Sequence, residues 1–501
     1  MEASGPEADE PGHARLIVAV TGLVILALWV VPLTSSLWID ELGTWWVVKD
    51  GLGPTLVRAW TYQGQSPLYY AIEWAARAVG GGNEVVLRLP SLAASVGSAV
   101  LLAGLVRRMI GREAARISGL VFAATSVVAF EASEARPYAI ATLAVVAATS
   151  ALVRWLDDGG WTRALVYALL AVLVVWVHYL FGLALISHGI YAAVRLRRRQ
   201  TGGVSVRHLA VVAGVMVAGV LPLVVQASSL WGRRSSLSIP ADASIQYLLA
   251  VLVPPVLMGA IFLGGLLSRL QGRLTVSPPS VRPSSLVLFV SWLLIPVAIL
   301  FLVSAVTPVT LLSPRYFASV APAGAALAGW AISAIDPPAA RRVVATLLAI
   351  LSVLAYGGTL KLGEDWRGAA AFERAHVDAG TIVLLHPALI ESAQLDWFDD
   401  PERLSYLLSV VSYYPMDGRV DLLPYTLDDP AEIYLERLVT SELAGADRFL
   451  LITRYPWVPY REWLDGRLAS DGFESRIIAR FGVIDVVEFR RPVSGAAPAG
   501  G

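Results

Sequence analysis

The stretch LIVAVTGLVILALWVVPLTSSLWIDE, residues 16–41, joins a long apolar run to a pair of acids. A bilayer-spanning helix needs about 20 apolar residues, so residues 16–34 are long enough to cross a membrane. The preceding tail is acidic rather than basic, and we therefore expect a retained span rather than a cleaved signal peptide. Asp40 and Glu41 then lie just beyond the first span.

The composition extends this interpretation to most of the chain. Of the 501 residues, 56% are hydrophobic and only 16% are charged, which is more apolar surface than a soluble domain can bury. The sixteen tryptophans suit the interfacial belts of a membrane protein. There are no cysteines, which excludes disulfides and thiolate metal sites. We expect a mainly α-helical polytopic membrane protein.

Eleven apolar segments are predicted to span the bilayer. They cover residues 16–34, 88–106, 115–132, 138–154, 164–178, 180–194, 209–227, 247–267, 285–305, 315–333 and 343–359. Residues 67–79 are not among them, because this helix would be only about 20 Å long against about 30 Å of hydrocarbon. This segment also carries Glu73 and Arg77, which are costly at the bilayer centre, so we expect it to lie in the interface.

The arginines test this topology. With residues 67–79 lying flat, the arginine-rich loops all fall on one side, which the positive-inside rule makes cytoplasmic. These arginines are Arg107, Arg108, Arg112, Arg116, Arg154, Arg163, Arg195, Arg197, Arg198, Arg199, Arg269, Arg273, Arg282, Arg341 and Arg342. The tail 1–15 is then cytoplasmic, and outer loop 35–87 is extracytoplasmic, in a protein of the plasma (inner) membrane.

The composition becomes that of a soluble domain after the last predicted span. We expect an α/β domain at residues 360–492, on the same side as Asp40, and a disordered tail at 493–501. Its predicted elements are a helix at 366–377, short buried strands at 381–385 and 449–453, and a strand pair at 478–490. The transmembrane part is therefore predicted to be residues 16–359.

Asp40 and Glu41 have two interpretations at this point. In the first, Asp40 caps an interfacial helix and Glu41 favours its positive end. In the second, one carboxylate deprotonates an acceptor hydroxyl. Adjacent side chains on a helix point about 100° apart, so only one of the two is expected to face a given cavity.

Other polar and aromatic residues gather where the predicted spans meet the outer surface. Arginines there run against the charge bias and can clamp a phosphate with paired donors, although each also fits an interfacial anchor. His178 fits an acid–base group, a metal ligand or a residue of the aromatic belt. The candidate substrate-binding residues are Gln65, Tyr69, Arg88, Arg136, Tyr138, His178, Tyr179 and Arg315.

Together these segments resemble the GT-C superfamily of membrane glycosyltransferases, in the branch of protein O-mannosyltransferases and the aminoarabinose transferase of lipid A. The resemblance rests on the order and spacing of Asp40-Glu41, Ser66-Pro67-Leu68-Tyr69-Tyr70, Arg88-Leu89-Pro90-Ser91, Ala135-Arg136-Pro137-Tyr138, His178-Tyr179 and Pro314-Arg315-Tyr316. The helix start Asp365-Trp366-Arg367 with the strand Thr381-Ile382-Val383-Leu384 is also similar to the outer domain of bacterial members.

The resemblance implies a GT-C-like fold and an inverting transfer of a sugar from a polyprenyl-phosphate donor to a lipid, glycan or protein hydroxyl outside the membrane. Asp40 would be the base and Glu41 its neighbour, while Arg136 and Arg315 would stabilise the charge on the leaving phosphate. Family members often have His-Pro-Pro or Lys-Pro-Pro where this chain has Gln65-Ser66-Pro67. A cationic or metal-binding contact is thus missing there, which leaves dependence on a divalent cation open; no metal ligands are assigned.

Two other functions fit parts of the sequence. A carrier or flippase for polyprenyl-linked sugars would need the spans but no bond chemistry. A catalytically inactive scaffold would use the outer domain to bind envelope proteins. The acidic pair, the outer domain and the lack of internal repeats favour the enzyme. Membrane lipids are expected partners, and the chain has no basic stripe for nucleic acid.

Overall fold

The computed structural model describes residues 10–63, 67–232, 275–277, 279–307, 311–355, 363–454 and 459–492. The chain divides into two compact units, which are described separately. The membrane unit comprises Met1–Leu33 and Asp50–Leu360, and the C-terminal unit comprises Thr34–Lys49 and Lys361–Gly501. Residues 34–49 thus belong to the same compact unit as the C-terminal residues, whereas the sequence analysis placed them in the transmembrane part 16–359.

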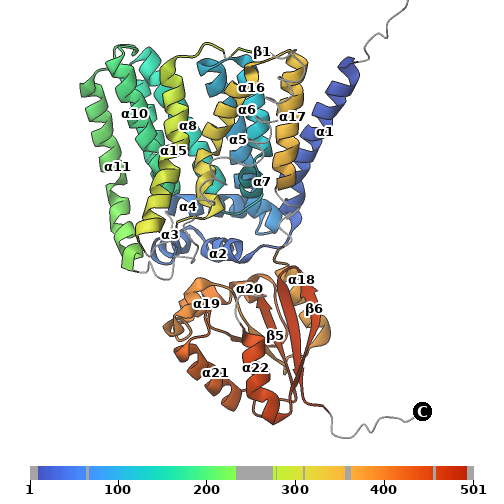
Figure 1. Ribbon diagram of the computed structural model, residues 1–501. Helices are drawn as coiled ribbons and strands as arrows, with labels where there is room; N and C mark the ends of the chain where they lie inside the picture. Colours follow the sequence, from blue (N-terminus) through green and yellow to red (C-terminus); the bar gives the residue numbers. More distant parts are fainter. Residues whose placement is uncertain are drawn as a thin grey trace, which may run out of the picture. The chain divides into compact units, whose positions relative to one another are not determined.

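Long helices dominate the membrane unit (Figure 1). In chain order its elements are α1 (Glu10–Val30), η1 (Val31–Thr34), α3 (Leu52–Thr61), α4 (Pro67–Gly80), α5 (Glu84–Met109), α6 (Arg112–Ala124), α7 (Ser126–Ala132), α8 (Tyr138–Asp158), α9 (Trp161–Val177), η2 (Tyr179–Leu183), α10 (Ala184–Arg197), α11 (Val206–Gly232), β1 (Thr275–Val276), α15 (Pro283–Val306), η3 (Pro314–Val320), α16 (Ala321–Ser333), β2 (Ile335–Asp336) and α17 (Pro338–Ala355).

The chain has the helices of a multi-pass membrane protein. Within the described ranges, six helical stretches are long and apolar enough to cross a bilayer, or eight if two bent pairs each count as one span. The predicted number of eleven is therefore confirmed only in part. The expected span 247–267 lies outside the described residues, and α9 is apolar but shorter than the six.

The predicted span 115–132 is broken into α6 and α7, which meet at an angle of 66°. Thr125 lies between them in an extended conformation (ψ 127°), and its hydroxyl donates to the Val121 carbonyl at 2.8 Å. Threonine and serine side chains compete for backbone hydrogen bonds, so Thr125-Ser126 can end one helix and start the next. A hydropathy average over residues 115–132 does not detect this break, so the sequence predicted a single span.

Two further features of the membrane unit agree with the sequence-based prediction. Residues 67–80 form the short helix α4, and the stretch 164–194 contains two helices, α9 and α10, joined through η2. The chain turns at His178, whose backbone is extended (φ −156°, ψ 119°). His178 is thereby placed at a helix end, where a side chain can face a cavity instead of a neighbouring turn.

Several predicted cytoplasmic arginines meet at one end of the membrane unit. Asp157, near the end of α8, lies 2.9 Å from Arg108, 2.8 Å from Arg195 and 3.6 Å from Arg282. Their common position agrees with the arginine pattern that set the predicted topology. The opposite end of α8 begins at Tyr138, about 30 Å away along the helix.

The C-terminal unit is an α/β domain (Figure 1). Its elements are α2 (Ile39–Val48), α18 (Trp366–His376), β3 (Ile382–Leu385), η4 (Ile390–Ala393), η5 (Leu395–Trp397), α19 (Pro401–Leu407), α20 (Ser409–Tyr413), β4 (Arg419–Leu422), α21 (Asp429–Ser441), β5 (Arg448–Arg454), α22 (Tyr460–Leu468), η6 (Ala469–Asp471), β6 (Glu474–Phe481) and β7 (Ile484–Arg490). The predicted helix, strands and terminal strand pair are all present.

The five-stranded sheet has the order β4-β3-β5-β7-β6. Strands β4, β3 and β5 are parallel, and β7 pairs antiparallel with both β5 and β6. The interior strand β3, which pairs with β4 and β5, is buried along its whole length, which explains its continuous apolar sequence. Helices α21 and α22 contribute Leu435 and Leu464 to a core that includes Phe449 and Phe489 of the sheet.

Candidate active site

Helix α2 carries the two acids that the sequence singled out. It begins after Trp38, and the Glu41 carboxylate reaches back to accept the Trp38 N–H at 3.2 Å. Glu41 is fully buried, whereas Asp40 is only half-buried. The two adjacent acids therefore differ as the helix geometry requires. Glu41 closes the start of the helix, and Asp40 is the more exposed of the two carboxylates.

Glu364 fixes the start of α2 on the C-terminal domain. Its carboxylate accepts the Ile39 N–H at 3.0 Å and the Trp366 indole N–H at 2.8 Å, and it forms an ion pair with Arg454 at 3.1 Å. Only 4% of Glu364 is exposed, and its burial raises the pKa of the carboxyl above the ordinary value, against the opposing effect of Arg454. We call these three contacts the Glu364 clamp.

Further contacts hold the rest of the segment 34–49. The Leu37 N–H donates to the Tyr414 hydroxyl at 2.8 Å, and the Trp46 indole donates to the Ser405 hydroxyl at 3.0 Å. Gly43 lies against the Tyr406 ring, where an added Cβ would come within 3.4 Å of the hydroxyl oxygen. Asp40 is thus presented on a backbone fixed by the C-terminal domain.

In the membrane unit, three aromatic side chains surround the His178 ring. The His178 ring lies 5.1 Å from Tyr138, 4.9 Å from Phe181 and 5.9 Å from Tyr316, measured between ring centroids. Tyr138 also lies 6.2 Å from Tyr316. We call His178, Tyr138, Phe181, Tyr316 and the two arginines described next the His178 cluster. These residues come from the start of α8 and the residues before it, the end of α9, η2 and the start of η3.

Arg136 and Arg315 supply the positive charge of the His178 cluster. The Arg315 guanidinium lies over the Tyr138 ring at 5.8 Å, and its Nε donates to the Ser313 hydroxyl at 3.1 Å. Both arginines act electrostatically on His178. Two guanidinium groups beside aromatic rings can bind an anion such as a phosphate and exclude water from it.

The other predicted residues lie elsewhere. Arg88 is fully buried and donates to the carbonyls of Pro32 and Leu33 at 2.9 and 3.0 Å, so it stabilises the end of the first helix. Tyr69 is buried with its ring 4.9 Å from Tyr70. Gln65 lies outside the described residues.

Tyr179 points away from the His178 cluster. Its hydroxyl donates to the side-chain oxygen of Gln226 on α11, and the Gln226 amide in turn donates to the carbonyls of Ala59 and Trp60, both at 3.3 Å. Tyr179 therefore links η2, α11 and α3. Its position directly after His178 in the sequence does not make it part of the same cluster.

Sequence reasoning missed Phe181, Tyr316 and Glu131 as neighbours of the site. Tyr316 was quoted only as part of the segment around Arg315, although its ring lies beside His178. Glu131, which is 2% exposed, acts electrostatically on Tyr138. A buried acid at the end of an apolar segment is costly, and that cost is the signal by which the sequence could have identified Glu131.

The described residues contain no group of three or more histidine, aspartate or glutamate side chains arranged to hold a metal ion. The positive charge of the His178 cluster comes from Arg136 and Arg315.

Residues 64–225 match the family model described as dolichyl-phosphate-mannose-protein mannosyltransferase. The fold matches ArnT from Cupriavidus metallidurans in the apo state, with 14% identity, a TM-score of 0.55 and coverage of 95% of this chain and 98% of that chain. It also matches the same protein bound to undecaprenyl phosphate, with 14% identity, a TM-score of 0.53 and coverage of 98% and 100%. No curated protein sequence matches the chain.

The fold is that of the GT-C membrane glycosyltransferases, which confirms the resemblance inferred from the sequence motifs. Within that class, the chain is similar to ArnT over nearly its whole length and to the mannosyltransferase family over residues 64–225.

Proposed function

We propose that this protein transfers a sugar from a polyprenyl-phosphate donor to an acceptor hydroxyl, with Asp40 as the general base. The observation that carries the proposal is the division between the two acids of α2. Glu41 is buried and bonded to the helix start, while Asp40 is half-exposed on a backbone held by the Glu364 clamp. A general base needs both access to its substrate and a fixed position.

The reaction is a single displacement at the anomeric carbon. Asp40 takes the proton of the acceptor hydroxyl as its oxygen forms a bond to that carbon. The bond from the anomeric carbon to the phosphate oxygen breaks, and its electron pair leaves with the polyprenyl phosphate. Attack opposite the leaving group inverts the configuration, and the proton remains on Asp40 until solvent removes it.

The His178 cluster is the proposed phosphate site. Arg136 and Arg315 would bind the donor phosphate and stabilise the charge that it gains as the sugar departs. A site of this kind agrees with the fold, since an ArnT structure of the same fold contains undecaprenyl phosphate. Fold similarity alone does not define activity, so the proposal rests on the residues of this chain.

The proposed orientation follows from the arginines. The end of the membrane unit that holds Arg108, Arg195 and Arg282 would face the cytoplasm of a plasma (inner) membrane. The His178 cluster and the C-terminal unit would then be extracytoplasmic. A lipid, glycan or protein hydroxyl on that side would be the acceptor.

The direct test is incubation of the purified full-length protein with defined polyprenyl-phosphate sugars and an envelope extract, followed by mass spectrometry of the products. A glycosyltransferase releases polyprenyl phosphate and increases the mass of an acceptor by one sugar residue. A carrier or flippase would instead move the donor across a vesicle membrane and leave it intact. Donor translocation without any sugar transfer would overturn the proposal.

A further inference from the structure

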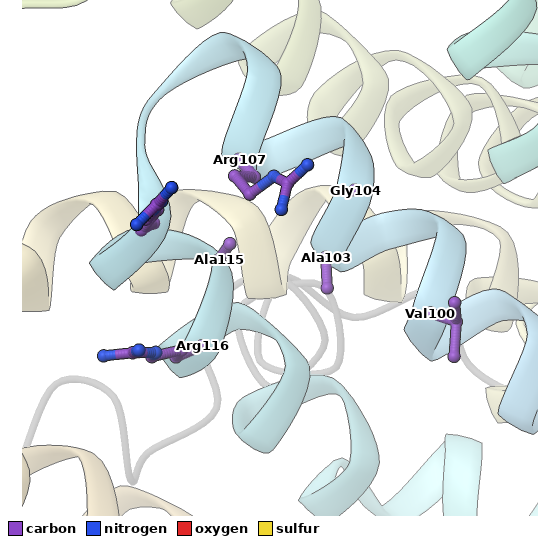
Figure 2. A pocket seen from close by; sticks show the side chains of 7 residues that line it. Val100, Ala103, Gly104, Arg107, Ala115 and Arg116 are labelled. Carbon is purple, nitrogen blue, oxygen red and sulfur yellow. The ribbon is translucent and has the colours of Figure 1, made fainter.

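A second cationic site lies in the membrane unit, far from the His178 cluster. A cavity of about 560 Å³ is lined by Val100, Ala103, Gly104 and Arg107 of α5 and by Arg112, Ala115 and Arg116 of α6 (Figure 2). Ser91 of α5 donates to the Arg136 carbonyl at 3.2 Å, which ties the start of α5 to the His178 cluster. Arg107 lies about 24 Å further along the same helix.

Only one of the three arginines that line this cavity, Arg116, has an acidic partner among the described residues. Glu113 pairs with Arg116 at 3.4 Å and also approaches Arg341 at 3.8 Å. Across the described ranges, neither Arg107 nor Arg112 has an acidic partner.

Arg108 gives the internal comparison. It follows Arg107 in the sequence and bonds to Asp157 at 2.9 Å and to Asp158 at 3.4 Å. The described part of the chain therefore supplies acids for Arg108 but not for Arg107 and Arg112, two of the three arginines that line the cavity. An external anion would complete the charge balance there.

The α5 side of the cavity is lined mainly by small apolar residues. Val100, Ala103, Gly104 and Arg107 recur at the spacing of one helix face, so they form a single stripe along α5. Val100 is 66% exposed, and an added Cβ at Gly104 would meet nothing within 4 Å. In a protein that spans a bilayer, an exposed apolar stripe of this kind faces lipid. The cavity thus has a cationic end joined to a surface that suits an acyl chain.

We propose that this cavity binds an anionic phospholipid from the leaflet at this end of the membrane. Arg107 and Arg112 would donate to the phosphate oxygens, and an acyl chain would lie along Val100 and Gly104. Basic pockets between membrane helices bind lipid headgroups through this combination of charge and apolar contact. The site is independent of the proposed sugar transfer, because none of its residues belongs to the His178 cluster or to α2.

The test uses the purified full-length protein in detergent, with phosphatidylglycerol or phosphatidylcholine added and bound lipid counted by native mass spectrometry. We expect one phosphatidylglycerol to be retained in preference to phosphatidylcholine. The double variant Arg107→Gln/Arg112→Gln should weaken this binding about thirtyfold, at about fivefold for each arginine. Both side chains are exposed, so the variant is expected to fold.

Two further variants separate the alternatives. Arg197→Gln/Arg198→Gln removes two exposed arginines that do not line the cavity, and its lipid binding should match that of the wild type. Gly104→Phe fills the open space beside α5 without changing the charge, and it should weaken retention of phosphatidylglycerol.

Three results would overturn the proposal. The first is equal retention of phosphatidylglycerol and phosphatidylcholine, and the second is equal loss of binding in the cavity variant and the Arg197→Gln/Arg198→Gln control. The third is displacement of the lipid by millimolar inorganic phosphate with no effect of Gly104→Phe, which would identify the ligand as a free phosphate rather than a lipid.

Discussion

The Glu364 clamp gives a prediction whose magnitude follows from its contacts. Glu364→Ala removes the acceptor of two buried donors, the Ile39 N–H and the Trp366 indole N–H. A buried donor without a partner costs about 1–3 kcal/mol, so the two together should destabilise the C-terminal unit by about 4 kcal/mol. Arg454 also loses its partner, but its side chain is 23% exposed and water can replace part of that interaction.

The assay is the apparent melting temperature of the full-length protein at a fixed scan rate, with hydrogen exchange to locate the change. For a domain of this size, about 4 kcal/mol corresponds to a decrease of roughly 10 °C. Amide exchange should accelerate in the peptides of α2 and β5. Glu364→Gln keeps a side-chain carbonyl as acceptor, so its decrease should be less than half as large.

The matched control is Glu436→Ala in the same unit. Glu436 pairs with Arg467 at 2.8 Å, but both side chains are substantially exposed, at 46% and 32%. Exposed pairs contribute about 0–1 kcal/mol, so this variant should melt close to the wild type. If Glu364→Ala and Glu436→Ala lower the melting temperature equally, the clamp does not hold α2 as described.

Three further predictions concern single residues. Arg315→Gln should lower kcat for sugar transfer about a hundredfold with a smaller change in the donor KM, and Arg315→Lys should retain part of the rate. Unchanged initial rates in Arg315→Gln would exclude a role of Arg315 in stabilising the leaving phosphate. Arg88→Gln should destabilise the membrane unit by about 2 kcal/mol, because Arg88 donates hydrogen bonds to the carbonyls of Pro32 and Leu33, and it should leave the donor KM unchanged. A raised KM with an unchanged melting temperature would instead make Arg88 a substrate-binding residue. Burial lowers the pKa of His386 to about 4, so as the pH falls the unfolded chain is protonated at this histidine before the folded protein is. The free energy of unfolding of the C-terminal unit should therefore fall by about 3 kcal/mol between pH 6.5 and 4. His386→Phe should remove this pH dependence, and identical pH–melting profiles of the variant and the wild type would contradict the prediction.

Local sequence patterns predicted much of the fold. The apolar run of β3 and the capped helix start at Asp365 carry their signals within a few residues, and both elements occur as expected. The two helices on either side of His178 correspond to the separately predicted spans 164–178 and 180–194. By contrast, the break at Thr125 depends on one hydroxyl and one backbone angle, which an average of hydropathy does not resolve.

Contacts between distant segments could not be predicted from these patterns. Ile39 and Glu364 are 325 positions apart, so no local signal assigns residues 34–49 to the C-terminal unit. Tyr179 was expected beside His178, but it bonds to Gln226, 47 positions later in the chain. Arg88 was expected to be a substrate-binding residue or an interfacial anchor, and it donates to carbonyls 55 and 56 positions earlier. In each case the sequence pointed to the residue but did not show which distant group it contacts.

The central claim is that Asp40 is the general base, and Asp40→Asn tests it most directly. This substitution keeps the size of the side chain and removes its ability to take a proton. The measurement is the rate at which a defined polyprenyl-phosphate sugar is consumed. The control is Asp50→Asn, because Asp50 is an exposed acid ten residues later in the chain that pairs with Arg58 at 2.7 Å. Asp40→Asn should lower the rate by about 10²–10⁴, while Asp50→Asn stays near the wild type. Full activity in a folded Asp40→Asn protein would contradict the assignment.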